Sequence, residues 1–307
     1  MQLVRGVVKT CLLYLAALIV IVLVVLAPRE VTTVPSKNHP AVIEFQYGFN
    51  WSVYKDNLIQ YVTGIWENNS LGGTMYPHRT VEEEIVEYLP RSLLIILTSF
   101  IISILVGVWK GIFDYLNTAS RKRILGKNAT SFFLAIPDFF LILCLQWLVI
   151  FYFPFIEFFG YDHWYSFILP SILVSIYPLM YIARITSGAI EGEEIQQYVL
   201  VAKSKGFTRK IILYNHILKN CWGAVLSHLS SVMLYILSNL LIVEYLLDYK
   251  GAAYRLFKAF HYTNVYSIGY VSEYEAEMVI GLAMSFMMIV FVTQLISQVA
   301  RIYVDPR

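Results

Sequence analysis

Long uncharged apolar runs alternate with shorter polar segments along the whole chain. Five runs hold no charged residue: Cys11–Ala27, Ser92–Trp109, His163–Ala183, Asn220–Val243 and Met278–Ala300. A sixth, Asn128–Ile156, is interrupted only by Asp138. About 20 apolar residues cross the hydrocarbon layer of a bilayer as a helix. The pattern therefore predicts an all-α integral membrane protein with six transmembrane helices.

The first apolar run has two interpretations. Arg5 and Lys9 precede it, as they would precede the apolar core of a cleaved signal peptide. However, no small-x-small cleavage site stands before the charged pair Arg29 and Glu30, and the run is long for a signal peptide. We therefore expect a retained transmembrane helix over residues 1–27.

The distribution of charge predicts the orientation. With the N-terminus inside, the inner segments 1–10, 110–127, 184–219 and 301–307 carry 15 Lys and Arg against 5 Asp and Glu. The outer segments carry 8 against 15. Basic residues concentrate on the cytoplasmic side of membrane proteins, so both termini are expected in the cytoplasm. The net charge of +2, with 58% hydrophobic and 14% charged residues, gives no reason to expect a nucleic-acid partner.

The residues that usually carry enzymatic or metal chemistry are scattered. Cys11, Cys144 and Cys221 lie in or beside different spans and have no spacing that suggests a disulfide or a zinc site. The six histidines occur singly, and no G-x-x-x-x-G-K-[ST] phosphate loop is present. We expect no catalytic residue, no bound metal and no cofactor in this chain.

One polar segment between two spans is unusually ordered. Residues 197–220, QYVLVAKSKGFTRKIILYNHILKN, are basic and amphipathic. The pattern predicts a short helix over Tyr198–Lys205 with Val199 and Ala202 on its less polar face. Gly206 can end that helix in the left-handed conformation, and Thr208 can cap a second helix that runs into the fifth span. On these residues alone, the segment is either an interfacial amphipathic helix or a partner-binding loop.

This segment resembles the EAA loop of bacterial ABC-importer permeases, in the variant of the dipeptide, oligopeptide and nickel branch. That variant reads E-Y-V-x-x-A-x-x-K-G and then H-x-L-x-N. The positions that match are Tyr198, Val199, Ala202, Lys205, Gly206, His216, Leu218 and Asn220. Gln197 replaces the initial Glu, which keeps the shape and loses a charge.

Five further segments resemble the same branch in the same order. Residues 71–95 resemble its L-G-x-S…L-P-x-T-L entry to the second span, with Ser92 in place of Thr, and 135–140 resemble S-I-P-x-F-W. The other three are 168–190, 243–256 and the terminal 304–307. The first 70 residues depart from the family, as do Lys250 in place of Pro, Gly251-Ala252-Ala253 in place of Gly-Leu-Gly, and an expanded outer segment over 244–277.

The resemblance implies the type I importer permease fold and a set of partners. These are a second, homologous permease subunit, expected to form a heterodimer with this chain, two cytoplasmic ATPase subunits that use ATP and magnesium, and an external solute-binding protein. It also implies that the loop within 187–220 is a coupling helix held by an ATPase subunit. The coupling residues carried over are Tyr198, Ala202, Lys203, Lys205, Gly206, Arg209, His216 and Asn220.

Polar residues inside the spans are candidates for a translocation path. Ser227, Ser231, Tyr235 and Ser238 form one small, polar stripe on the fifth span, with His228 and Asn239 beside it. The stripe lines such a path or serves close helix packing. Asp138 follows Pro137 in the third span and either faces a wet interior or caps a helix that restarts after the proline.

The chain is thus expected to comprise an N-terminal helix (1–27), an extracytoplasmic segment (28–90) and a five-helix permease core (91–307). The function that fits best is the permease subunit of an ATP-driven importer in the bacterial plasma membrane. Peptides are the expected substrate, with nickel chelates or another small solute as alternatives. An ion-coupled secondary transporter would show several charges within its spans, and a membrane-embedded enzyme would show convergent catalytic groups. The acidic cluster Glu82, Glu83, Glu84 and Glu87 is expected to be a solvated face or a docking site for the external protein.

Overall fold

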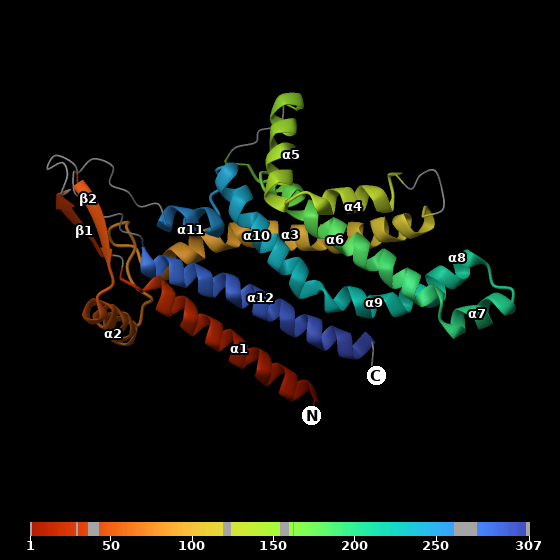
Figure 1. Ribbon diagram of the computed structural model, residues 1–307, viewed down its shortest axis with the longest axis horizontal. Helices are drawn as coiled ribbons and strands as arrows, with labels where there is room; N and C mark the ends of the chain where they lie inside the picture. The colour runs from red at the N-terminus through yellow and green to blue at the C-terminus, as the bar shows by residue number, and fades with distance from the viewer. Residues whose placement is uncertain are drawn as a thin grey trace. The chain divides into compact units, whose positions relative to one another are not determined.

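The computed structural model describes residues 2–28, 30–35, 43–118, 124–153, 160–161, 163–260 and 275–304. The protein is built almost wholly from helices (Figure 1). The helices are α1 (Gln2–Val25), α2 (Trp51–Asn68), α3 (Val81–Leu116), α4 (Lys127–Ala135), α5 (Asp138–Tyr152), α6 (Ile168–Glu194), α7 (Gln197–Ser204), α8 (Arg209–Ile212), a π-helical segment (Leu213–Ile217), α9 (Leu218–Ser227), α10 (Leu229–Leu246), α11 (Ala252–Phe260) and α12 (Ala276–Val304). The exception is an antiparallel pair of strands, β1 (Glu30–Pro35) and β2 (Ile43–Gly48), in which Glu30 pairs with Gly48 and Pro35 with Ile43.

Five of these helices are long and apolar enough to cross a membrane. They are Gly6–Val25, Val81–Leu116, Ile168–Glu194, Leu229–Leu246 and Ala276–Arg301. The expected third span is instead the pair α4 and α5, which meet at 103° and bring the count to six if the pair is one broken span. The cause lies at the break, because the residue before a proline is pushed out of the helical region. Ile136 has φ −85° and ψ 133°, and Pro137 has φ −55° and ψ 134°.

The expected fifth span is also interrupted. His228 ends α9 and precedes α10, with φ −102° and ψ 2°, so residues 220–243 are not one continuous helix. The chain divides into two compact units. One comprises residues 1–7, 91–250 and 288–307, and the other comprises 8–90 and 251–287.

The first unit depends on very close contact between α3 and α6. Gly107 and Gly111 lie one turn apart on α3, and each faces α6 without a side chain. A Cβ on Gly107 would meet the Leu179 carbonyl oxygen at 2.9 Å, and one on Gly111 would meet the Ala183 carbonyl oxygen at 2.6 Å. Small residues in this G-x-x-x-G spacing are typical of tightly packed membrane helices.

Hydroxyl groups continue this seam toward the other end of α3. The Ser99 hydroxyl donates a hydrogen bond of 3.0 Å to the Ser171 carbonyl of α6, and that of Ser103 donates one of 3.3 Å to the Ser175 carbonyl. Thr98 and Ser171 share a further hydrogen bond of 2.6 Å between their hydroxyls. The two helices are therefore joined along their length by small and hydroxyl side chains.

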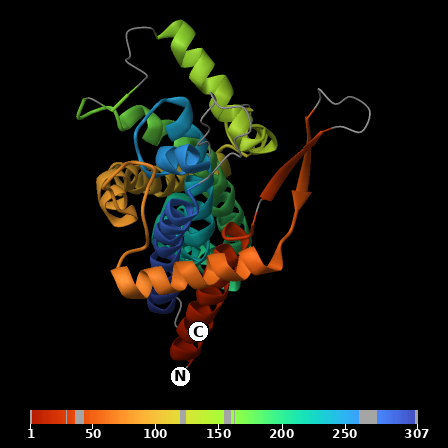
Figure 2. The same ribbon diagram turned by 90° about the vertical axis from the view of Figure 1, so that its left-hand side faces the viewer.

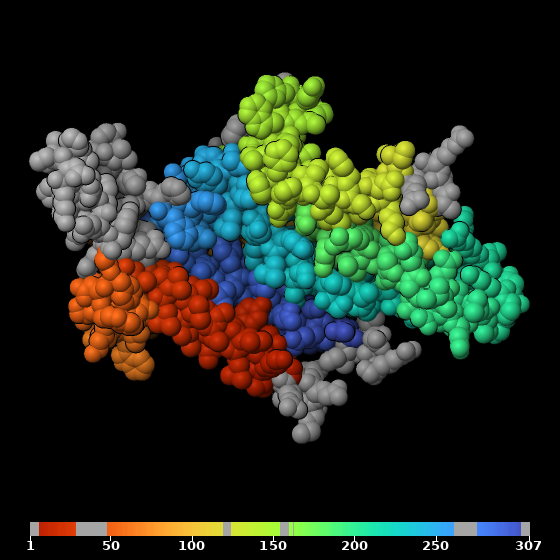
Figure 3. All heavy atoms as spheres, in the orientation of Figure 1, coloured from red at the N-terminus to blue at the C-terminus, as the bar shows by residue number. Residues whose placement is uncertain are grey.

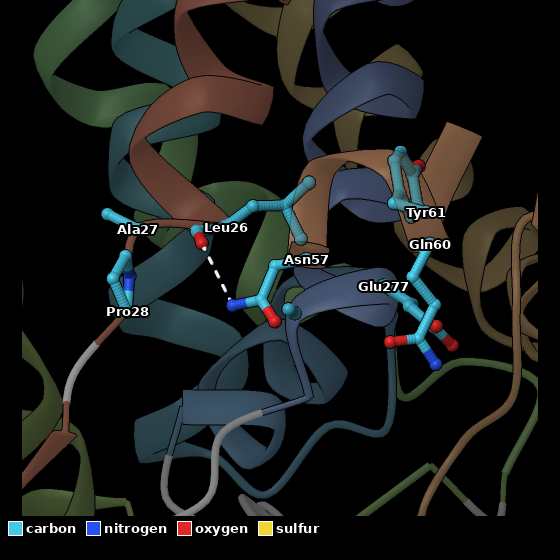
Figure 4. Close-up of a pocket in the computed structure, with 8 residues that line it drawn as sticks. Leu26, Ala27, Pro28, Asn57, Gln60, Tyr61 and Glu277 are labelled. Atoms are coloured by element: carbon cyan, nitrogen blue, oxygen red, sulfur yellow. Dashed lines mark hydrogen bonds between the residues drawn. The ribbon is translucent and has the colours of Figure 1, made fainter. Parts of the chain in front are cut away.

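The second unit gathers the last turn of α1 and the first turns of α12 with α2 and α11. Tyr61 of α2, Leu26 after α1 and Ile280 of α12 form one buried cluster. The Tyr54 hydroxyl donates to the Leu23 carbonyl at 2.8 Å, and the Asn57 amide donates to the Leu26 carbonyl at 3.4 Å (Figure 4). The last turn of α1 is thus attached to α2.

A buried ion cluster holds α11 in the same unit. The Arg255 guanidinium, 1% exposed, binds the Glu275 carboxylate through two hydrogen bonds of 3.0 and 2.7 Å and also contacts Glu84. Burial favours the neutral form of Arg255, but the bonds to Glu275 and Glu84 outweigh this and raise its pKa. The expectation of a solvated acidic face is wrong for Glu84, which is fully buried.

The close contact between α3 and α6 leads to a prediction about the stability of the folded protein. Gly111→Ala places a methyl group against the Ala183 carbonyl and should destabilise the protein by about 1–3 kcal/mol, the usual cost of overpacking. Thermal unfolding in detergent measures this. Gly188→Ala on α6 is the matched control, because a Cβ there meets no atom within 4 Å. An unchanged midpoint for Gly111→Ala would contradict the close contact.

Candidate functional site

The candidate site begins where α6 ends. Helix α6 runs to Glu194, and after a two-residue turn the chain forms α7. Lys205 follows α7, and Gly206 then takes the left-handed conformation with φ +80°, as the sequence predicted. The Thr208 hydroxyl accepts from the Ile211 amide and caps α8, which also confirms the sequence prediction. Figure 1 shows α7 and α8 side by side beyond the end of α6.

Helix α7 is fixed to the rest of the first unit by one apolar face. Val199 is fully buried and Ala202 is 6% exposed. They belong to a cluster whose other members are Tyr115, Ile190, Ile212, Leu213, Ile217 and Cys221. This cluster joins the C-terminal ends of α3 and α6 to α7, α8 and the start of α9. Ala202 therefore packs against the chain's own core.

Two carboxylates at the end of α6 add polar connections to the same loop. The Tyr198 hydroxyl donates to Glu193 Oε2 at 2.7 Å, and the Asn220 amide donates to the same oxygen at 3.4 Å. Glu193 thereby links α6, the first turn of α7 and the start of α9. Tyr198 and Asn220, two of the residues that match the family pattern, therefore meet at one carboxylate of this chain. We call this contact the Glu193 junction.

The neighbouring carboxylate reaches the basic side of the loop. Glu194 Oε1 lies 3.8 Å from Lys203 Nζ and 4.0 Å from Arg209 Nη2. Arg209 also donates to the Tyr115 hydroxyl at 3.3 Å and lies 5.3 Å from the centroid of that ring. Exposed ion pairs such as these contribute little stability, so they orient the two basic side chains rather than hold the fold.

The environment of Tyr198 keeps its hydroxyl protonated. Burial and the hydrogen bond to Glu193 raise the pKa of Tyr198 to about 12. The hydroxyl is therefore a hydrogen-bond donor throughout the physiological pH range, and the Glu193 junction does not titrate through it.

The opposite face of the loop is exposed and is both apolar and basic. Leu200 is 57% exposed and Val201 52% exposed on α7. Phe207 and Tyr214 extend this surface past the glycine, and Lys205 and Lys210 have no ion-pair partner among the described residues. Beside it lies a hollow of about 670 Å³ lined by Tyr198, Phe207, Ile211, Asn215, His216, Lys219 and Asn220. We call Leu200, Val201, Lys205, Phe207 and Tyr214 the loop surface.

The sequence-predicted coupling residues therefore take three kinds of position. Tyr198, Ala202 and Asn220 make internal contacts that position the loop. Lys203 and Arg209 pair with Glu194, whereas Lys205 and Gly206 stand at the exposed turn, and the His216 ring lies 6.1 Å from that of Phe207. Sequence reasoning missed Glu193, Glu194 and Tyr115. The two acidic residues directly before a basic loop were the available signal.

The candidate path residues are only partly brought together. Tyr235 of α10 contacts the rings of Tyr177 and Tyr181 on α6, at centroid distances of 5.1 and 5.2 Å. Tyr181 shares a hydrogen bond of 2.7 Å with His228 Nδ1. This aromatic group joins α6 to the α9–α10 break, and the sequence stripe did not identify its tyrosines on α6.

The serines and Asp138 take other positions. Ser227 and Ser238 are exposed, Ser231 is half-buried and Asn239 is fully buried, so the stripe does not present one uniform wall. Because α9 ends at His228, Ser227 is not in helical register with the α10 residues. Asp138 is the first residue of α5 and its carboxylate accepts from the Phe139 amide at 2.9 Å. This agrees with the interpretation of a helix that restarts after Pro137.

The fold is similar to that of a solved ABC importer. It matches a chain of the MetNI methionine ABC transporter in an inward-facing conformation with a TM-score of 0.57 and 13% identity, over 72% of this chain and 96% of that one. At this identity the likeness concerns the fold, which is that of a type I importer permease.

The family follows from the sequence of the core. Residues 103–307 match the family described as the inner membrane component of binding-protein-dependent transport systems, and the chain belongs to this family. It is 24% identical to the dipeptide transport system permease protein DppB of Alkalihalophilus pseudofirmus, over 73% of this chain and 75% of that protein. A putative peptide transport system permease of Brucella abortus is 26% identical over 62% of this chain and 63% of its own length. The glutathione permease GsiC of Salmonella typhimurium is 24% identical over 62% of each.

The expected class is therefore confirmed. The protein is a multi-pass membrane permease component of an ABC importer, a class in which ATP hydrolysis and external solute binding belong to other components.

The Glu193 junction leads to a testable expectation about the loop. Glu193→Ala removes the acceptor of Tyr198 and Asn220, and a hydrogen bond to a charged group contributes about 1.5–3 kcal/mol. Amide hydrogen exchange of residues 197–204 should accelerate by about tenfold, which corresponds to about 1.4 kcal/mol. Glu191→Ala is the control, because Glu191 lies on the same helix and pairs at 3.0 Å with Lys127, a residue outside the loop. Equal exchange in both variants would contradict this role of Glu193.

Proposed function

We propose that this permease imports peptides, driven by ATPase subunits that bind the loop surface on the cytoplasmic side. The observation that carries the proposal is that α7 is attached on one face and exposed on the other. The attached face connects to α3, α6 and α9, and the exposed face presents apolar and basic side chains. A surface of this kind suits a partner that must both hold the loop and move the helices behind it.

The connections of the loop support a mechanism. When two ATPase subunits close on ATP, a displacement of α7 is carried through Glu193 to α6 and α9 and through Arg209 and Tyr115 to α3. Because α3 and α6 are packed without intervening side chains at Gly107 and Gly111, these two helices tilt together. The pore then alternates between outward and inward access, a two-state equilibrium that nucleotide shifts.

The remaining partners follow from the same assignment. We propose a second, homologous permease subunit as the other half of the pore, forming a heterodimer with this chain, and an external solute-binding protein that delivers the cargo. We also propose that both termini lie in the cytoplasm, which is supported by the excess of basic residues in the segments on the same side as the termini. ATP and magnesium are used by the ATPase subunits and not by this chain.

The translocation path is assigned to the region around α6 and α10. Tyr177, Tyr181 and Tyr235 offer aromatic faces and hydroxyls, as a path for peptides of varied side chains requires, and His228 is hydrogen-bonded to Tyr181. Ser231 and Ser238 lie on the same helix as Tyr235, and Ser227 ends the helix before it. Asp138 remains a weaker candidate because its carboxylate is engaged at the start of α5.

Peptides are proposed as cargo because two of the relatives are named as a dipeptide permease and a putative peptide permease. They match 73% and 62% of this chain. Uptake by the complete transporter in proteoliposomes should be inhibited by unlabelled di- and tripeptides. A nickel chelate should not compete. Inhibition by the chelate alone would replace the peptide assignment with a metal-chelate one and leave the permease assignment intact.

The loop surface is tested by charge at its exposed positions. Leu200→Glu or Lys205→Glu should lower ATP-driven uptake by at least about tenfold, since the dominant contacts at the centre of an interface contribute about 2 kcal/mol or more and about 1.4 kcal/mol corresponds to tenfold. Basal ATPase activity should persist. Gly206→Asp is a less selective variant because φ +80° strains any residue that has a Cβ.

The control for these variants is Lys258→Glu on α11, which makes the same charge change as Lys205→Glu at an exposed residue outside the loop and outside the candidate spans. Unchanged uptake for Leu200→Glu and Lys205→Glu would refute the role of the loop surface. A loss in the control as well would show that charge alone, rather than this surface, determines activity.

A further inference from the structure

Helix α2, in the segment where the family resemblance is weakest, has three distinct longitudinal stripes. Tyr54, Leu58, Tyr61 and Ile65 pack against the outer ends of α1 and α12. One residue further along the chain lies a second stripe, Trp51, Lys55, Ile59, Val62 and Trp66, all of which are exposed. One residue further still is a third, exposed and polar: Asp56, Gln60, Thr63 and Glu67.

The order of these stripes around the helix is informative. Successive residues of a helix are about 100° apart, so the exposed apolar stripe lies between the protein-facing stripe and the polar stripe. Apolar residues therefore occupy a wider part of the circumference of α2 than the part that packs against α1 and α12. Trp51, Val62 and Trp66 are 74%, 62% and 88% exposed, which is unusual for such side chains in contact with water.

The setting of α2 indicates what covers this stripe. The helix is seen end-on in Figure 1, where α1 is seen along its length, so α2 lies crosswise to the span it packs on. Figure 2 shows α2 along its own length, and Figure 3 shows its atoms directly beside those of α1. The apolar window of α1 is only 6% buried within this chain, so α2 lies beside an exposed apolar surface of a candidate membrane span.

The residue types agree with a place at the membrane boundary. Tryptophan near each end of the helix is typical of the layer between hydrocarbon and water. Lys55, the one charged residue in the exposed apolar stripe, can extend its ammonium group toward phosphates while its methylenes stay among apolar groups. The third stripe would then face water with Asp56 and Glu67.

We propose that α2 is an interfacial helix that lies in the outer surface of the bilayer, with Trp51, Ile59, Val62 and Trp66 in lipid. Its protein-facing stripe fastens it to the outer ends of α1 and α12. Through the hydrogen bonds of Tyr54 and Asn57 it sets the depth at which α1 leaves the membrane.

The test measures what surrounds each stripe and does not depend on transport. In a background with the exposed Cys11 and Cys144 changed to Ala and the buried Cys221 retained, single cysteines are introduced and spin-labelled. Ile59→Cys and Val62→Cys report the apolar stripe, and Asp56→Cys and Thr63→Cys are the matched controls on the polar stripe. The protein is studied in nanodiscs of phosphatidylethanolamine and phosphatidylglycerol.

Collision rates with oxygen, which dissolves in lipid, and with a water-soluble nickel chelate separate the outcomes. The oxygen-to-nickel ratio at 59 and 62 should exceed that at 56 and 63 by at least about fivefold, as for a helix half sunk in the interface. Equal ratios on both stripes would mean that water covers the apolar stripe, and this would overturn the proposal. Exclusion of both reagents at 59 and 62 would mean that a protein covers it, which also overturns the proposal.

Discussion

The close contact between α3 and α6 is the constraint on which the rest of the first unit depends. Membrane helices gain no hydrophobic energy by leaving lipid for one another, so their association relies on short-range packing and hydrogen bonds. Gly107 and Gly111 allow backbone to approach backbone, and Ser99 and Ser103 bond to carbonyls of α6. A pair packed in this way moves as one body, which is what a helix must do to transmit force.

The loop over residues 197–220 continues the same principle beyond the ends of α3 and α6. Val199 and Ala202 bury the attached face of α7, and the Glu193 carboxylate binds both ends of the loop. An amphipathic helix merely lying on lipid would need no such internal junction. The connections of α7 to three other helices therefore favour a helix that transmits motion to the spans over one that only rests on the membrane surface. They also explain why the residues shared with the family include internal as well as exposed positions.

Much of this fold could be predicted from the sequence, because the lipid environment requires long apolar helices and the loop carries explicit signals. Gly206 correctly indicated the end of α7, and Thr208 correctly indicated the start of α8. Both signals are reliable because a left-handed turn and a hydroxyl cap are local properties of the chain. The breaks at Pro137 and His228 were harder to predict. The length of an apolar run can be read from the sequence, but a change in the direction of the helix axis within that run cannot. Proline alone signals the first, and nothing local signals the second.

The site was predicted less completely because its geometry depends on distant partners. The predicted serine stripe assumed one continuous helix from Ser227 to Ser238. The helix is interrupted at His228, so Ser227 does not belong to the same helix as the other residues of the stripe. The tyrosines of α6 that meet Tyr235 are 54 and 58 residues away in the chain, so periodicity within one span does not reveal them. Glu84 was misjudged for the same reason, since its partner Arg255 is 171 residues distant.

The departures from the family at the start of α11 have a structural explanation that the sequence did not suggest. Ala252 and Ala253, where the family has Leu and Gly, are fully buried at the start of α11. Ala252 packs in a cluster with Val81, Met278 and Leu282, and Arg255 of the same helix closes the ion cluster with Glu84 and Glu275. Breaking one partner of a buried ion cluster is far more costly than changing an exposed residue. These replacements therefore belong to the packing of α11.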